Sequence, residues 1–283
     1  MPMPVGRRPL RGRRPAAPGQ RSAPADLQNG AMRSFDELVT EADHAPVEGW
    51  DFSWLDGRAT EERPPWGYAR ALARRLAEAG ASLDLQTGGG EVLAEAGTYP
   101  PLAVATEGWR PNLVVAAARL RPLGVAVLGH DEAAPLPFAD ASFDLVSSRH
   151  PVSTDWAEIA RVLVPGGRYF SQQIGPASMV ELSEAFLGPL PDADRWRRPE
   201  DARAAAERCG LEVVDLRSAR LRAEFSDVGA IVYVLRKCVW WVPGFTVERY
   251  RDTLRRLHQQ MVDDGPFVAH SSRFLVEARR PPR

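Results

Sequence analysis

A glycine-rich segment, Gln-Thr-Gly-Gly-Gly at residues 86–90, follows a run of apolar residues and precedes a helical pattern. Asp84 lies two residues before it. Glycine lets a backbone approach a ligand without a clash from Cβ, and the N–H groups at the start of a helix can donate hydrogen bonds to it. The segment therefore predicts a bound nucleotide-like ligand, but its glycines alone do not identify the ligand.

Two further acids end the next two apolar runs. Glu107 follows the second run, where an acid can accept hydrogen bonds from both hydroxyls of a ribose, and Asp131 follows the third. Singly, Asp84 could cap a turn and Glu107 could be a solvated acid. Ligands of open α/β sheets bind at the carboxyl ends of strands, so the three acids together favour one nucleoside site. Glu132 is a further candidate contact, although its position alone suggests a solvent-facing side chain.

Polar residues just after the fourth apolar run and within the fifth would lie where a second substrate meets the nucleoside. His150 is the candidate general base or substrate contact, with a histidine hydrogen-bonded within its loop as the alternative. Arg149 could bind an acidic group or pair with a nearby acid. Gln172 is a candidate positioning group, and Trp241 could line an apolar pocket or belong to the core.

The elements that must position these residues are short apolar runs alternating with helical patterns. Strands are predicted at 82–86, 102–106, 125–128, 143–148, 168–173, 211–218 and 273–278. Helices are predicted at 68–79, 91–96, 111–120, 156–163, 200–209, 228–239 and 247–263. This order predicts an α/β fold: a Rossmann-like, doubly wound, mostly parallel seven-stranded sheet with helices on both faces. The last strand would pair with the one before it, and the two helices between them would form a lid.

The chain divides into four predicted parts. Residues 1–31 are rich in arginine and proline and are expected to be a disordered tail, since they cannot bury enough apolar surface to fold. Residues 32–80 would form a helical and irregular cap, residues 81–222 the ligand-binding core, and residues 223–283 the lid helices and the final strand.

Composition narrows the classes of function. The net charge of -1 gives no global attraction to nucleic acid or to an anionic membrane. Two cysteines without metal-ligand spacing suggest neither a disulfide framework nor a metal site, and no apolar run approaches the ~20 residues of a membrane span. We therefore expect a soluble cytoplasmic protein, monomeric or homodimeric, without a metal.

Residues 81–175 as a whole resemble the class I S-adenosylmethionine-dependent methyltransferases, in a type 11-like branch whose substrate is unassigned. The resemblance is carried by the loop at 84–90, Glu107, Gly-His-Asp-Glu at 129–132, Pro-Leu-Pro-Phe at 135–138, Phe-Asp-Leu-Val at 143–146 and Pro-Gly-Gly at 165–167. It implies these roles: Asp84 facing the methionine ammonium, Gly88 and Gly90 beside the cofactor, Glu107 on the ribose and Asp131 on the adenine amino group. The chain departs from the family pattern at Gln86, which replaces the first glycine of the loop.

The function this implies is transfer of a methyl group from S-adenosylmethionine to an O, N or C atom of a small-molecule acceptor, releasing S-adenosylhomocysteine. An RNA or protein acceptor is the alternative, supported by the arginine-rich tail and by Arg195, Arg197 and Arg198. A non-catalytic binding domain with a degenerate loop is a second alternative, permitted by Gln86. A nicotinamide dehydrogenase is disfavoured, because Asp84 stands where dinucleotide folds begin with glycine.

Overall fold

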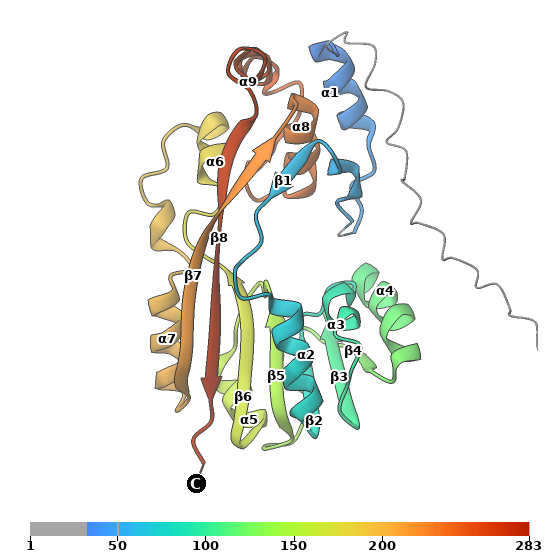
Figure 1. The fold of residues 1–283 in the computed structure, drawn as a ribbon, viewed down its shortest axis with the longest axis vertical. Coiled ribbons are helices and arrows are strands. Elements are labelled where there is room, and N and C mark those ends of the chain that lie inside the picture. The colour runs from blue at the N-terminus through green and yellow to red at the C-terminus, as the bar shows by residue number, and fades with distance from the viewer. Residues whose placement is uncertain (1–32, 50, 283) are drawn as a thin grey trace, which may run out of the picture. The chain divides into compact units, whose positions relative to one another are not determined.

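The computed structural model describes residues 33–49 and 51–282, of which those from Phe35 onward belong to one compact unit, Phe35–Arg283. The predicted tail at 1–31 lies outside the described residues. This unit is built on an eight-stranded sheet (Figure 1), with strand order β1-β7-β8-β6-β5-β2-β3-β4. The strands are β1 Ala59–Glu61, β2 Ala81–Leu85, β3 Leu102–Glu107, β4 Ala126–Gly129, β5 Phe143–Arg149, β6 Leu163–Ile174, β7 Glu212–Phe225 and β8 Phe267–Arg279.

The predicted Rossmann-like sheet is confirmed. β4, β3, β2, β5 and β6 pair in parallel, and β8 runs antiparallel between β6 and β7. The sheet has one strand more than the sequence predicts, because the short β1 pairs with the end of β7. Its three residues are half-buried or exposed, so they carry no apolar pattern that would have revealed them.

Helices cover both faces of the core of the sheet. α2 Tyr68–Glu78, α3 Glu91–Glu95 and α4 Arg110–Leu120 pack on one face, against a cluster that includes Leu145, Phe170 and Leu275. α5 Trp156–Val162 and α7 Pro199–Arg208 pack on the other, against Val146, Tyr169 and Val276. Neighbouring residues of one strand thus enter opposite clusters, which is why these strands read as continuous apolar runs.

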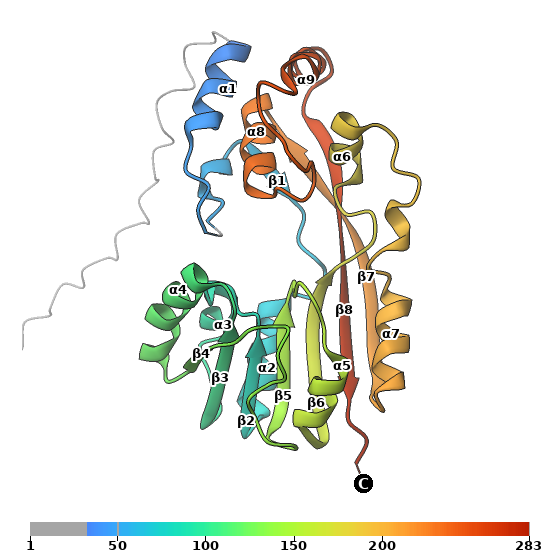
Figure 2. The ribbon, with the colours of Figure 1, turned by 180° about the vertical axis from the view of Figure 1, so that it is seen from behind.

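Apart from the clusters on the two faces of the sheet lies a separate hydrophobic cluster, the second cluster. It surrounds the C-terminal end of β7 and the N-terminal end of β8 (Figures 1 and 2). It is formed with α1 Phe35–His44, α6 Val180–Leu187, α8 Val228–Lys237 and α9 Arg251–Asp264. α8 is buried along nearly its whole length. The two helices predicted before the last strand are α8 and α9, and they lie beyond the carboxyl ends of β5 and β6. No helix among the described residues is long and apolar enough to cross a membrane.

An ion cluster fastens α2 to the middle of the sheet. The carboxylate of Glu277 on β8 is buried and accepts hydrogen bonds from Arg75 of α2 and from Arg168 of β6, the latter at 2.9 Å. Burial acts to raise the pKa of Glu277, but the two guanidinium groups outweigh it and hold this pKa below its usual range. Arg75 also lies over the Phe170 ring, 3.9 Å from its centroid.

We expect Glu277→Gln to lower the free energy of unfolding by about 3 kcal/mol, because two guanidinium groups lose their charged partner in a partly buried site. Urea unfolding at neutral pH measures this. The control is Glu212→Gln, which removes an exposed ion pair to Arg279 on the same strand pair and should change stability by under about 1 kcal/mol. Equal effects of the two variants would contradict a special role for the buried cluster.

Candidate active site

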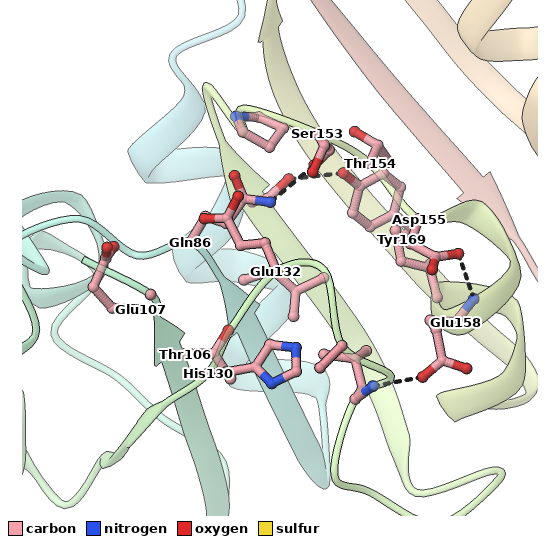
Figure 3. A pocket seen from close by; sticks show the side chains of 17 residues that line it. Gln86, Thr106, Glu107, His130, Glu132, Ser153, Thr154, Asp155, Glu158 and Tyr169 are labelled. Carbon is pink, nitrogen blue, oxygen red and sulfur yellow. Dashed lines mark hydrogen bonds between the residues drawn. The ribbon is translucent and has the colours of Figure 1, made fainter. Parts of the chain in front are cut away.

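A crevice opens at the carboxyl end of β2, the point where the strand order of the sheet reverses. β2 pairs with β3 on one side and with β5 on the other, so the loops that leave these strands diverge. Figure 3 shows Gln86 and Glu132 near the middle of the crevice, Glu107 on the side of β3, and Tyr169 on the side of β6. The crevice is lined by residues 85–86, 106–108, 130, 132, 134, 136, 148, 151, 153–155, 158–159 and 169.

The glycine loop bends through left-handed backbone conformations. Gly88 has φ of 62° and Gly90 has φ of 77°. A Cβ on Gly90 would lie 2.8 Å from Cδ1 of Leu120, so glycine lets the loop pack closely on α4. A Cβ on Gly88 would meet nothing within 4 Å, which leaves open space beside the loop.

Glu107 holds the loop from the end of β3. Its buried carboxylate accepts hydrogen bonds from the backbone N–H of Gly88 at 2.8 Å and from that of Trp109 at 2.8 Å. A carboxylate offers about four lone-pair sites, so these two bonds leave acceptor capacity on each oxygen. Glu107 lines the crevice, where the sequence predicted a ribose contact.

Asp84 lies beneath the loop and does not line the crevice. Its carboxylate is buried and accepts a hydrogen bond from the Ser147 hydroxyl at 2.6 Å. Burial raises the pKa of Asp84 to about 6, against the opposing effect of the Ser147 and Thr87 hydroxyls. Asp84 thus braces β2 against β5 in this structure.

The two acids after β4 are placed differently from each other. Asp131 is exposed, does not line the crevice, and accepts a hydrogen bond at 3.0 Å from the backbone N–H of Ala133. Glu132 is exposed, as the sequence suggested, and it also lines the crevice. Burial, followed by the charge of Glu107, raises the pKa of Glu132. The structure therefore brings Glu107 and Glu132 to the crevice and leaves Asp84 and Asp131 at its margins.

Gln86 connects the two sides of the crevice. Its Oε1 accepts a hydrogen bond from the backbone N–H of Val152 at 2.6 Å, and its Nε2 donates one to the carbonyl of Ser153 at 2.8 Å. The residue has φ of 54°, a left-handed conformation that usually favours glycine. The amide ties the glycine loop to the segment after β5 in place of the family's glycine.

His150 and Gln172 meet at the carboxyl edge of β5 and β6. The Nε2 atoms of the two side chains lie 2.9 Å apart, and Gln172 accepts a hydrogen bond at 2.7 Å from the indole N–H of Trp66. Burial, followed by the charges of three arginines, lowers the pKa of His150 to about 2. Arg149 is the strand partner of Gln172 and its side chain is exposed.

Trp241 lies elsewhere, in the second cluster beyond the sheet. It is half-buried there and contacts Trp240 edge to face, with ring centroids 6.3 Å apart. No contact in the described part of the chain joins it to His150 or Gln172.

Two partners of the site residues are not predicted by the sequence: Trp66, which bonds Gln172, and Ser147, which bonds Asp84. The Ser147 contact could have been predicted. Strand alternation places Ser147 on the same face of the sheet as Arg149, and the strand register places it opposite Asp84. The Trp66 contact could not have been predicted, because it joins residues 106 positions apart in the sequence and depends on how α2 packs.

Comparisons with known proteins agree with this architecture. Residues 83–171 match a family model described as a methyltransferase domain. No curated protein matches the chain by sequence. Among solved structures, a putative methyltransferase from Bacillus halodurans is 21% identical with a TM-score of 0.53, over 75% of this chain and 98% of that one. The YcgJ protein from Bacillus subtilis is 17% identical with a TM-score of 0.52, over 76% of this chain and 99% of that one.

These structural likenesses show the fold, and the family model covers the glycine loop, Glu107, Glu132 and His150 and ends at residue 171, just before Gln172. The part of the chain that carries the crevice, residues 83–171, thus matches the methyltransferase domain family by sequence.

Proposed function

We propose that the protein binds S-adenosylmethionine in the crevice at the end of β2 and transfers its methyl group to a small-molecule acceptor. The observation that carries the proposal is the placement of Glu107. Its carboxylate lines the crevice, keeps acceptor capacity, and lies beside a glycine loop with open space next to Gly88. A ribose with two hydroxyl donors is suited to this acid.

The other residues of the crevice fit a nucleoside as well. Leu85 and Leu136 supply apolar walls, and Glu132 adds an acid opposite the glycine loop. Gly108 lies so near the carbonyl of His130 that a Cβ would come within 2.9 Å of it, which keeps the adjoining wall free of a side chain. We assign Glu107, Glu132 and the loop at 86–90 to the cofactor, with Asp84 supporting the loop from below and Asp131 at the edge.

Two features support a small acceptor over RNA. Helices α6, α8 and α9 lie on the side of the sheet where β5 and β6 end, and so stand over the acceptor region (Figures 1 and 2). In the arginine group predicted as an RNA patch, Arg195 pairs with Asp192 at 3.0 Å and Arg198 with Glu200 at 3.8 Å. This pairing neutralises most of the local positive charge that an RNA backbone would require.

When bound, S-adenosylmethionine supplies a methyl group already activated by its positive sulfonium. The protein then has to align the acceptor and exclude water, and alignment alone is worth ~7 to 11 kcal/mol. A general base adds about 10²- to 10⁴-fold in rate. Alignment is therefore the larger contribution that the chain's own residues can make.

The hydrogen bonds of His150 make it a positioning group in this proposal. An indole N–H only donates, so the Trp66 bond fixes Oε1 of Gln172 toward Trp66 and Nε2 of Gln172 toward His150. Nε2 of His150 must then accept, and its proton resides on Nδ1. With its lone pair engaged and a pKa of about 2, His150 offers an N–H donor to an acceptor and is poorly suited to remove a proton.

We expect Glu107→Gln to weaken S-adenosylmethionine binding by about tenfold or more, because a charge-assisted hydrogen bond contributes about 1.5–3 kcal/mol. Calorimetric titration measures the dissociation constant, and circular dichroism checks that the variant is folded. Asp215→Asn on β7, whose partner is Arg217, is the matched control and should bind like the wild type. Unchanged binding by folded Glu107→Gln would refute this site.

Two variants of Gln86 test whether its side chain connects the glycine loop to the segment after β5. We expect Gln86→Ala to lose about 1–2 kcal/mol of stability with its two hydrogen bonds, and Gln86→Gly to regain about 1 kcal/mol of that loss, since glycine relieves the left-handed backbone. Urea unfolding measures both. An alanine variant as stable as the wild type would show that the amide does not tie the loops together.

The tautomer of His150 can be observed directly. We expect ¹⁵N NMR of histidine-labelled protein to show a neutral ring protonated on Nδ1 from pH 8 down to pH 5, with the signal assigned by its loss in His150→Ala. Because the pKa is far below that of free histidine, no protonation should occur in this range. A cationic ring at pH 6, or a proton on Nε2, would restore the general-base interpretation.

A further inference from the structure

Three hydroxyl groups of β5 and β6 form a buried set, the hydroxyl chain. The Oγ atom of Ser148 lies 2.7 Å from Oη of Tyr169 and 2.9 Å from Oγ of Ser171. All three residues are buried, and the strand register places Ser171 beside Ser148. Within the described part of the chain, these are the only hydrogen bonds that the three hydroxyl groups make.

The hydroxyl chain has one O–H more than its own hydrogen bonds can use. Three hydroxyl groups carry three protons, but two hydrogen bonds use only two of them. A buried donor without an acceptor is costly, so Ser171, which is fully buried, donates to Ser148. The free O–H then belongs to Tyr169 if Ser148 donates to it, and to Ser148 if Ser148 accepts from both neighbours. Tyr169 and Ser148 both line the crevice, so either arrangement offers one O–H to a bound ligand.

The phenol of Tyr169 is a neutral and well-fixed member of this chain. Burial is the largest influence on it and raises its pKa above the ordinary value, so the phenol keeps its proton at neutral pH. Trp156 packs against the ring edge to face, with ring centroids 5.3 Å apart. The Thr154 hydroxyl and the Gln173 amide, bonded to each other at 3.3 Å, also act on the phenol but do not hydrogen-bond it.

The crevice around the free O–H is acidic. No arginine or lysine of the described chain lines it, whereas four acids do: Glu107, Glu132, Asp155 and Glu158. Asp155 is close to Tyr169, because the adjoining Trp156 contacts the Tyr169 ring. Arg161 does not offset these acids, since it pairs with Glu158 and with Asp140 at once. The ligand group that meets the free O–H is therefore a neutral acceptor and not an anion.

Apolar side chains flank the same part of the crevice. Leu136 and Ile159 line it and are buried. Asp131, which the family resemblance assigns to the adenine amino group, does not line it. Glu107, assigned above to the ribose, lies on the opposite side, toward β3 (Figure 3). A base that extends from a ribose at Glu107 toward β6 would lie between the apolar side chains, with one edge facing the hydroxyl chain.

We propose that the pair Tyr169 and Ser148 donates a hydrogen bond to a ring nitrogen of the cofactor's adenine. This inference rests on the proposed function and adds a base-recognition contact to it. The ring nitrogens of adenine are neutral acceptors in an apolar plane, which suits a single O–H between apolar walls. The proton of Ser171 matters because it occupies Ser148 from the buried side and leaves the free O–H at the crevice.

The test measures calorimetric binding of S-adenosylhomocysteine and of three analogues, each with one ring nitrogen of the base replaced by C–H. We expect Tyr169→Phe or Ser148→Ala, whichever removes the free O–H, to weaken binding of S-adenosylhomocysteine about fivefold. The same variant should bind one analogue as tightly as the wild type does, since that analogue lacks the nitrogen that accepts the bond. Circular dichroism checks that each variant is folded.

Tyr68→Phe is the matched control. It also removes a buried phenol O–H, but this one donates to the backbone carbonyl of Ser148 at 2.9 Å and not to the crevice. Its dissociation constant should change less than twofold. The wild type supplies a second measurement that needs no variant: it should bind at least one analogue about fivefold more weakly than S-adenosylhomocysteine.

Three results would overturn the inference. The first is unchanged binding of S-adenosylhomocysteine in both folded variants, and the second is an equal loss in Tyr68→Phe. The third is that the wild type binds all three analogues as tightly as S-adenosylhomocysteine, which holds even if a variant does not fold. If the wild type binds neither S-adenosylhomocysteine nor S-adenosylmethionine, the proposed function itself fails. Tight cofactor binding that is indifferent to the ring nitrogens would leave that function intact and remove only the base contact.

Discussion

β2 pairs in parallel with β3 on one side and with β5 on the other, and the whole carboxyl edge of the sheet depends on this double pairing. It brings the glycine loop between Glu107 of β3 and the segment that follows β5. The Asp84–Ser147 hydrogen bond, with both partners buried, fixes β2 against β5 from below. Gln86 then closes the same connection from above. The crevice is therefore held by strand pairing first and by side chains second.

The proposed acceptor side of the site is held by side-chain hydrogen bonds rather than by strand pairing. Here a donor-only indole fixes the orientation of an amide, and the amide fixes the tautomer of an imidazole. Each member has a defined hydrogen-bonding direction, so Trp66 sets the orientation of His150, the residue proposed to meet the acceptor, without contacting it directly. Trp66 precedes α2, whose position is fixed by the buried Glu277 and its two arginines. The packing of α2 thus influences the proposed acceptor site through the hydrogen-bonded side chains of Trp66, Gln172 and His150.

Most of the core could be predicted from the sequence, because strands buried on both faces are continuous apolar runs. The α6 helix could not, since it is eight residues long and its N-cap residue, Met179, makes no side-chain capping hydrogen bond. At the site, the positions of Glu107, His150 and Gln172 follow from strand ends, whereas their partners do not. Residue type alone does not predict the turn that Asp131 forms with Ala133, nor the hydrogen bonds by which Gln86 connects two loops.

The second cluster has no sheet of its own. Its β structure is the far half of the β7–β8 ribbon, where residues 220–225 pair with 267–272 beyond the last residue of β6, and β1 merely extends this ribbon. Separating the cluster from the core would require breaking two strands that are continuous through both. The helices of the second cluster and the core that holds the crevice are consequently coupled in folding, and a substitution that weakens the ribbon destabilises both.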